Sequence, residues 1–289
     1  MILPDFTIPS QINQQWQYTG IDSPEHCLDK KHFKSYPHVF DYCYNSRGYR
    51  DHEWPTELNK LKNAIWCVGD SFTVGIGSPV EHTWPYILQQ QTGRRIINVS
   101  MDGASNQWMA RKIKRIIEVV APKTIVVQWS YFSRRESAVG TDDERRMQYD
   151  LTQLDDDQNI ENFKNCVLET KRICTDCQLI NSIIPDAFSG ISPIEVNGWW
   201  NNDREFSWPE QLPNSLNDVP LNILDKLQKK QQHTKYIIHY ILQDFIKNNN
   251  MILVNQYDEM FIKEVARDGH HYDLSTATKF VKELQANLI

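Results

Sequence analysis

Five short apolar runs, separated by amphipathic stretches, constrain the fold of this chain more than any other feature. The runs are AIWCVG at 64–69, IINVS at 96–100, TIVVQW at 124–129, LINSII at 179–184 and MILVN at 251–255. Apolar residues with helical spacing fill the intervals, most clearly from Gln107 to Val120. Short apolar strands that alternate with helices are typical of parallel crossover units. The sequence therefore predicts an α/β protein with a doubly wound, mainly five-stranded parallel sheet between helices.

Two regions depart from this alternation. Residues 1–60 are rich in aromatic and turn-forming residues without sustained periodicity, and we expect an irregular arm packed on a core domain of residues 61–289. The segment 185–220 combines several prolines with Trp199, Trp200, Phe206 and Trp208 and is predicted to be an insertion after the fourth strand. A last helix is expected at 275–288, with one side formed by Thr278, Val281, Leu284 and Leu288.

Composition excludes several classes of protein. The formal charge is −6 and no basic block is present, which argues against nucleic acid as a partner and against a polybasic membrane anchor. No apolar run approaches the roughly 18 residues of a spanning helix. The first ten residues lack the pattern of a secretory signal, so we expect a cytoplasmic location.

The cysteines predict free thiols rather than a disulfide framework, because six of them are sparse in a chain of 289 residues. Cys174 and Cys177 have the C-x-x-C spacing of half a zinc site. No second pair of Cys or His with ligand spacing follows them. We therefore expect packing and not metal binding at this pair.

Two motifs far apart in the sequence carry candidate chemistry. The first apolar run leads directly into Gly69-Asp70-Ser71, which delivers a serine hydroxyl to the rim of the sheet, although Ser71 taken alone is also a plausible helix cap. Near the C-terminus, Asp268 and His271 are three residues apart, a spacing that allows a carboxylate to orient an imidazole. Together these residues suggest a nucleophile, a general base and its orienting acid.

In these motifs the chain resembles the SGNH hydrolases, also called the GDSL family of esterases, lipases and acetylhydrolases. The resemblance implies a flavodoxin-like fold, Ser71 as nucleophile, His271 as base and Asp268 as the orienting acid, while His270 has no assigned role. It also implies an oxyanion hole in which the backbone N–H of Ser71 is one donor. Gly103, after the second strand, is the best match for the glycine that supplies a second backbone N–H.

The chain departs from the family in its third block, G-x-N-D, whose asparagine would complete the oxyanion hole. After the third strand it reads Trp129-Ser130-Tyr131-Phe132-Ser133, with neither glycine nor asparagine. Asn106, Ser130 and Gln128 are candidate replacements, with Asn106 preferred because it is an amide in the adjoining loop. The alternative for Asn106 is a cap of the helix that begins near Gln107.

An upstream segment, Asn45-Ser46-Arg47-Gly48-Tyr49-Arg50, is similar to an N-S-x-G-[FY]-R segment of some family members. We expect it to dock the arm on the core, with Gly48 in a turn. Arg134, Arg135 and Glu136 follow the third strand, where they would contact an anionic substrate or form a solvated, salt-linked turn. The solvated turn is the favoured interpretation.

The resemblance implies a serine esterase that works by two-step acyl transfer and needs neither an organic cofactor nor a metal. A short-chain ester or an O-acetyl group on a small or carbohydrate substrate is the favoured target. The alternatives are an O-acyltransferase with the same triad and a non-catalytic glycan-binding or structural member of the fold. The sequence does not define the oligomeric state.

Overall fold

The computed structural model describes residues 6–18, 40–132, 134–136, 156–184, 233–254 and 271–289. The predicted insertion at 185–220 lies outside the described residues, as do Asp268 and His270. No helix in the described ranges is long and apolar enough to cross a membrane.

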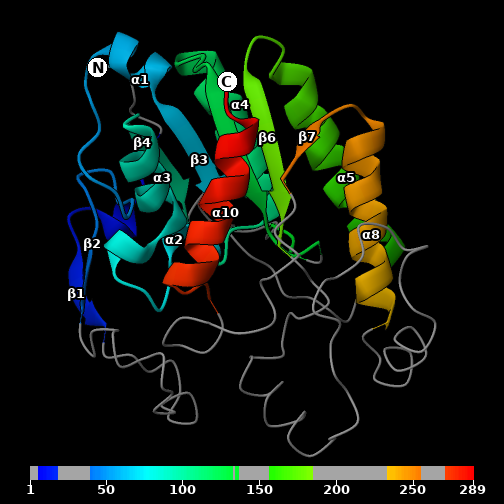
Figure 1. Ribbon diagram of the computed structural model, residues 1–289, viewed down its shortest axis with the longest axis horizontal. Helices are drawn as coiled ribbons and strands as arrows, with labels where there is room; N and C mark the ends of the chain where they lie inside the picture. The colour runs from blue at the N-terminus through cyan, green and yellow to red at the C-terminus, as the bar shows by residue number, and fades with distance from the viewer. Residues whose placement is uncertain (1–5, 19–39, 133, 137–155, 185–232, 255–270) are drawn as a thin grey trace, which may run out of the picture.

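The described core is a parallel sheet whose strands match the five apolar runs (Figure 1). In chain order the strands are β3 (Ile65–Gly69), β4 (Ile96–Ser100), β5 (Thr124–Trp129), β6 (Gln178–Ile183) and β7 (Ile252–Leu253). Their spatial order is β4-β3-β5-β6-β7, which is the 2-1-3-4-5 order of flavodoxin-like proteins. This order and the parallel pairing confirm the predicted fold class.

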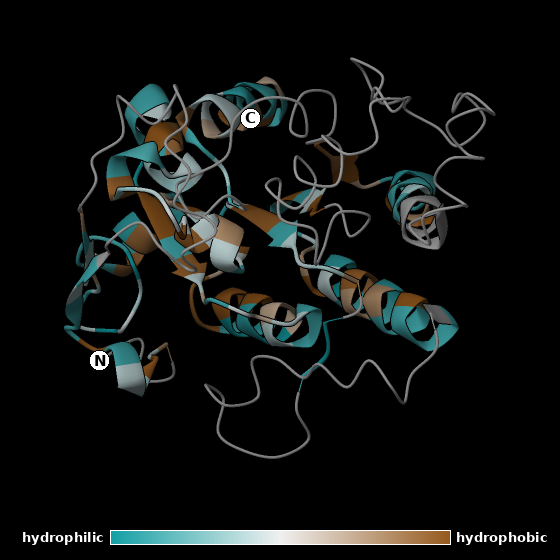
Figure 2. Ribbon diagram, turned by 90° about the horizontal axis from the view of Figure 1, so that it is seen from below, coloured by the Kyte–Doolittle hydropathy of each residue, from teal (hydrophilic) through white to brown (hydrophobic). Residues whose placement is uncertain are grey.

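Helices cover both faces of the sheet, which explains why β3 and its two neighbours, β4 and β5, are mostly apolar. Every residue of β3, β4 and β5 is buried. Side chains alternate between faces: Trp66 and Val68 join the cluster that includes α4 (Asn106–Val119) and α5 (Asp156–Ile173), while Ile65 and Cys67 join the opposite cluster. Figure 2 shows the two layers with apolar residues between them.

The opposite layer contains α3 (Trp84–Thr92) and α10 (Leu274–Asn287), while α8 (His233–Asn248) lies beside α5. Trp84 of α3 meets Phe280 of α10 edge to face, with ring centroids 5.2 Å apart. The prediction for α10 was wrong in one position, because Thr278 is exposed. Ala277 and Phe280 are buried beside Val281 and Leu284, since the apolar stripe of this helix follows the i, i+3, i+4, i+7 pattern from Ala277.

The described part of the arm contains regular structure that the sequence analysis did not predict. Strands β1 (Gln15–Tyr18) and β2 (Phe40–Cys43) form an antiparallel pair, and a short helix, α1 (Leu58–Asn63), precedes β3. Along β2, buried and exposed residues alternate. Four residues are too few for this period-2 pattern to stand out among so many aromatic residues.

Candidate active site

Ser71 is the first residue of α2 (Ser71–Val74), a short helix at the carboxyl end of β3 (Figure 1). Asp70 is the N-cap of this helix, and its Oδ1 accepts a hydrogen bond from the backbone N–H of Phe72 at 3.0 Å. Ser71 is therefore not the cap. Its side chain is buried, yet neither its hydroxyl nor its backbone N–H bonds to another described residue.

Gly69 allows α2 to turn back closely onto the end of β3. A Cβ atom at this position would lie 1.9 Å from Thr73 Oγ1 and 2.7 Å from Thr73 Cβ. Thr73 is itself fixed, because its hydroxyl donates to Gln128 Oε1 at 2.6 Å. The glycine before the serine is therefore required by the close approach of Thr73.

Gly103 lies in a turn at the end of β4, the strand beside β3. Ala104 N donates to Met101 O at 3.0 Å, and the φ of Gly103 is +70°, as a type II turn requires at its third position. The turn is tied to the serine loop, since Met101 N donates to Gly69 O at 3.2 Å. The N–H of Gly103 makes no hydrogen bond within the described part of the chain.

Asn106 joins two loops at the carboxyl edge of the sheet. Its Nδ2 donates to Tyr131 O at 3.0 Å, and its Oδ1 accepts from Ser130 N at 2.9 Å. Asn106 is not the cap of α4, so that alternative was wrong. Ser105 is the cap, and its hydroxyl accepts from Trp108 N at 3.1 Å. One amide hydrogen of Asn106 remains for a further acceptor.

Gln128 and Ser130, the other candidates for the third block, are held by partners of their own. Gln128 Oε1 accepts from Thr73 Oγ1 and Trp84 Nε1, and its Nε2 donates to Tyr272 Oη at 3.2 Å. Ser130 Oγ donates to Asp70 Oδ2 at 2.5 Å. Gln128 therefore links α2, α3 and the segment before α10, whereas Ser130 supports Asp70.

Arg134 forms a buried ion pair with Asp70 that the sequence analysis did not foresee. Arg134 Nη1 lies 2.8 Å from Asp70 Oδ2, and the two side chains are 8% and 0% exposed. The same Nη1 donates to Ser130 Oγ at 3.0 Å. Burial raises the pKa of the Asp70 carboxyl, while the Arg134 charge and the hydrogen bond from Ser130 lower it.

The prediction of a solvated turn at 134–136 was therefore wrong. Arg134 is buried, and Arg135 and Glu136 are half-buried. Arg135 Nε donates to Asn159 Oδ1 at 2.9 Å, and Glu136 forms an ion pair with Arg111 of α4. Each charge has a partner far away in the sequence, which explains why local charge density did not indicate burial.

His271 lies next to α2, although it follows Ser71 by most of the length of the chain. Its ring centroid is 4.6 Å from that of Phe72, the residue after Ser71. The neighbouring Tyr272 holds this segment in place, because its carbonyl accepts from Ser78 Oγ at 3.0 Å and its ring lies 4.8 Å from Phe72. Asp273 then caps α10 by accepting from Thr276 N at 2.8 Å.

The arm contacts the other end of α2 through Arg50. Arg50 donates to Val74 O at 3.1 Å, to Gly75 O at 2.6 Å and to Ser78 O at 2.7 Å. The guanidinium also lies over the Tyr42 ring, 4.0 Å from its centroid. In the same segment Gly48, with φ +81°, passes so close to Ile8 O that a Cβ would clash.

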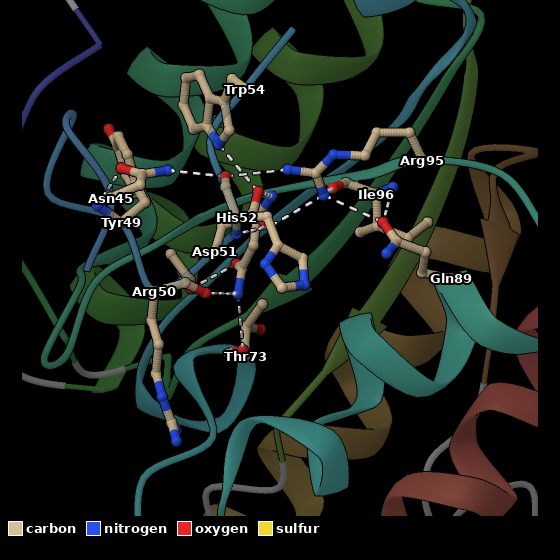
Figure 3. Close-up of polar contacts among 12 residues, drawn as sticks. Asn45, Tyr49, Arg50, Asp51, His52, Trp54, Thr73, Gln89, Arg95 and Ile96 are labelled. Carbon is tan, nitrogen blue, oxygen red and sulfur yellow. Dashed lines mark hydrogen bonds and ion pairs between the residues drawn. The ribbon is translucent and has the colours of Figure 1, made fainter. Parts of the chain in front are cut away.

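A small cleft beside the arm is lined by charged groups that are paired with one another (Figure 3). Arg95 Nη1 lies 2.9 Å from Asp51 Oδ1 and also bonds to Gln89 Oε1. Asp51 Oδ2 accepts from Asn98 N on the open edge of β4 at 3.0 Å. These contacts cover an edge strand, which would otherwise expose unpaired backbone groups.

No group of three His, Cys, Asp or Glu side chains that could hold a metal occurs among the residues that the structure describes. Cys174 and Cys177 are both free thiols. A hydrogen bond between them raises the pKa of the Cys174 thiol and lowers that of Cys177. They form a local pair at the end of α5.

No protein-family model matches the sequence, and a search of curated proteins finds no match. A search of solved structures does find similar chains. A psychrotrophic esterase from a Pseudoalteromonas species is 13% identical, with a TM-score of 0.42 over 78% of this chain and 96% of its own. A member of the lipolytic protein G-D-S-L family from Veillonella parvula is 15% identical, with a TM-score of 0.43 over 77% and 96%.

A family two carbohydrate esterase from Clostridium thermocellum, in complex with cellohexaose, is also similar. It is 12% identical, with a TM-score of 0.41 over 78% of this chain and 63% of its own. The G-D-S-L group named among these structures is the one that the sequence motifs resemble.

Proposed function

We propose that this protein is a serine esterase that works by two-step acyl transfer. Ser71 is the nucleophile, His271 the general base and Asp268 the acid that orients it. The backbone N–H groups of Ser71 and Gly103, with the side-chain amide of Asn106, hold the oxyanion. The favoured substrate is a short-chain ester or an O-acetyl group on a small or carbohydrate molecule.

One observation carries this proposal: the ring of His271 packs against Phe72, the residue that follows Ser71. This contact places an imidazole against the helix that begins with the serine, at the carboxyl edge of a parallel sheet, which supports base-assisted attack by Ser71. The edge also lies at the switch point of strand order between β3 and β5, where open α/β sheets bind ligands.

The backbone supports an oxyanion hole on the same edge. Ser71 and Gly103 both have N–H groups without a described partner, and the loops that carry them are joined by the bond from Met101 N to Gly69 O. Donors fixed before the reaction stabilise developing negative charge without reorganisation. Each proton and charge of acyl transfer then has a protein group assigned to it, so the proposed reaction needs no cofactor.

In this proposal residues 61–289 form the catalytic domain and residues 1–60 its docked arm. The contacts of Arg50 support this division of the chain into domain and arm, because its side chain reaches from the arm to the carbonyls at the end of α2. The arm is then a support for the nucleophile helix and not a separate binding module.

Hydrolysis of p-nitrophenyl acetate by the wild type, Ser71→Ala and Ser46→Ala tests the proposal. Ser46 is exposed, so its replacement controls for loss of a serine hydroxyl as such. We expect turnover by the wild type and by Ser46→Ala, and only background hydrolysis by Ser71→Ala. Equal turnover by all three proteins would contradict the assignment of Ser71.

The same assay separates the two alternatives. An O-acyltransferase would release p-nitrophenol faster when an alcohol acceptor is added, and the acetyl group would appear on that acceptor. A non-catalytic binding member of the fold would show no turnover by the folded wild type. Mass analysis of the products with and without glycerol or a soluble oligosaccharide distinguishes transfer from hydrolysis.

A further inference from the structure

Three neighbouring loops at the carboxyl edge of the sheet are joined by a continuous set of buried polar contacts. Asn106, after β4, binds the backbone of Ser130 and Tyr131, after β5. Ser130 in turn donates to Asp70, after β3. All the side chains that make these contacts are buried. The loops that carry the proposed oxyanion donors are thus linked through the loop that departs from the family pattern.

Asp70 is the centre of this set. One carboxylate oxygen accepts a hydrogen bond from the backbone N–H of Phe72. The other accepts hydrogen bonds from Ser130 Oγ and Arg134 Nη1. Since Ser71 lies between Asp70 and Phe72, the carboxylate spans the residue whose hydroxyl is the proposed nucleophile and whose N–H is a proposed oxyanion donor. The position of that carboxylate therefore sets the position of Ser71.

The ion pair argues against a role for Arg134 in the recognition of an anionic substrate. Its charge is balanced by Asp70 at 2.8 Å, and only 8% of its side chain is exposed. A neutralised, buried guanidinium offers a ligand little attraction beyond that of an ordinary dipole. An ion pair of this kind fixes geometry when its partners also have hydrogen bonds to neighbouring groups, as both do here.

We infer that Arg134 is a positioning residue: by holding the Asp70 carboxylate, it fixes the turn that presents Ser71 and its backbone N–H. The third-block loop of this chain thus supports the oxyanion hole through Arg134 and Ser130 instead of adding its own asparagine. This inference rests on the proposed role of Ser71 as nucleophile.

The charged and titratable groups around Asp70 determine how its pKa changes when Arg134 is removed. Arg134 faces Asp70 from the loop after β5, and His271 and Tyr272 face it from the segment before α10. Burial raises the pKa of Asp70, and Arg134 is the largest influence that lowers it. Removing Arg134 raises this pKa further, so Asp70 becomes protonated at a higher pH than in the wild type.

The test measures the rate at which a fluorophosphonate labels Ser71, as a function of pH, in the wild type, Arg134→Gln, Arg134→Lys and Arg135→Gln. Arg135→Gln is the matched control, because it removes the same charge one residue away without a contact to Asp70. We expect Arg134→Gln to label about 100-fold more slowly, as a misplacement of about 1 Å would cause. Its acid limb should move to higher pH, while Arg134→Lys recovers most of the rate.

A second readout needs no activity. Amide hydrogen exchange over residues 70–76 should become faster in Arg134→Gln than in Arg135→Gln, with unchanged exchange in β4. The inference would be overturned if Arg134→Gln were labelled, and exchanged its amide hydrogens, as fast as the wild type. It would also be overturned if labelling and exchange changed as much in Arg135→Gln as in Arg134→Gln. A wild type that resists labelling would contradict the proposed function alone, since hydrogen exchange still decides the role of Arg134.

Discussion

The ring of His271 lies against the ring of Phe72, with a centroid separation of 4.6 Å and an angle of 53° between the planes. Phe72 follows Ser71 in α2, so this contact places the proposed base against the residue next to the proposed nucleophile. The contact depends on α10. Asp273 is the N-cap of this helix, so it fixes where the helix begins and where the residues before the helix lie. The start of the last helix thus helps to assemble the candidate active site.

Replacement of the proposed base should slow chemistry without unfolding the protein. We expect His271→Gln to reduce fluorophosphonate labelling of Ser71 by about 100- to 10,000-fold, the usual range for a general base. The control is His52→Gln, because His52 is an exposed residue of the arm. If His271→Gln is labelled as fast as His52→Gln, His271 is not the base.

Asn106 is predicted to contribute one oxyanion donor in addition to its structural bonds. Asn106→Asp keeps an acceptor for Ser130 N but loses the amide hydrogens, and we expect turnover of an ester to fall about 100- to 1000-fold, with a smaller change in KM. Steady-state kinetics check this expectation. Gln107→Ala, at the next position of α4, should retain turnover, and a loss as large as that of Asn106→Asp would argue for a structural effect.

Arg50 is expected to stabilise the fold through three carbonyl groups at the end of α2. Arg50→Met leaves buried acceptors at Val74, Gly75 and Ser78 without this donor, at about 1–3 kcal/mol for a buried group left unsatisfied. We predict a loss of about 3 kcal/mol or more in the free energy of unfolding, measured by urea denaturation.

The control for Arg50 is Arg47→Met, in the same arm segment. Arg47 lies over the Trp54 ring at 5.6 Å, an interaction worth about 0.5–1 kcal/mol at a partly exposed site. A similar loss of stability in both variants would show that the contacts of Arg50 with α2 contribute nothing special.

His239 should make the protein less stable in acid. Burial lowers its pKa to about 3, with a further contribution from the Lys247 charge, whereas in an unfolded chain the pKa is about 6.5. Between these values the unfolded state binds the extra proton, so stability falls as pH falls, by up to about 1.4 kcal/mol per pH unit. Urea unfolding at pH 7, 6 and 5 measures the slope.

His239→Gln removes the titrating group and keeps a polar partner for Gln243, whose Nε2 lies 2.6 Å from His239 Nε2. The slope of stability against pH should therefore become shallower in this variant. An unchanged slope between pH 7 and 5 would assign the acid sensitivity to other residues.

The sheet and its helices were predictable because their signals are local. β3 is apolar at every position, and β4 and β5 are fully buried and mostly apolar, so each stands out in the sequence as a short apolar run. In α4, Met109, Ile113 and Ile116 repeat with the period of a helix and are all buried. Such patterns depend on the geometry of a single element, so they can be recognised in the sequence without knowing which elements pack against it.

The buried polar contacts of the site were not predictable in this way. Arg134 follows β5 among other charged residues, and its burial is tolerable because the carboxylate of Asp70 balances its charge. That partner comes from a different strand, whose position is set by the order of strands in the sheet. The cap of α4 was also not predictable from local sequence, because Ser105 and Asn106 are both residue types that favour the N-cap position. Ser105 is the cap in the structure, while the side chain of Asn106 donates to Tyr131 O.

The most direct test of Ser71 as the nucleophile is to treat the folded protein with a fluorophosphonate and locate the added mass by peptide mass spectrometry. We predict one labelled peptide containing Ser71, no labelling of Ser71→Ala, and no labelling of wild type unfolded in urea. Absence of label on folded wild type, or label that persists in Ser71→Ala, would contradict the claim that Ser71 is an activated nucleophile.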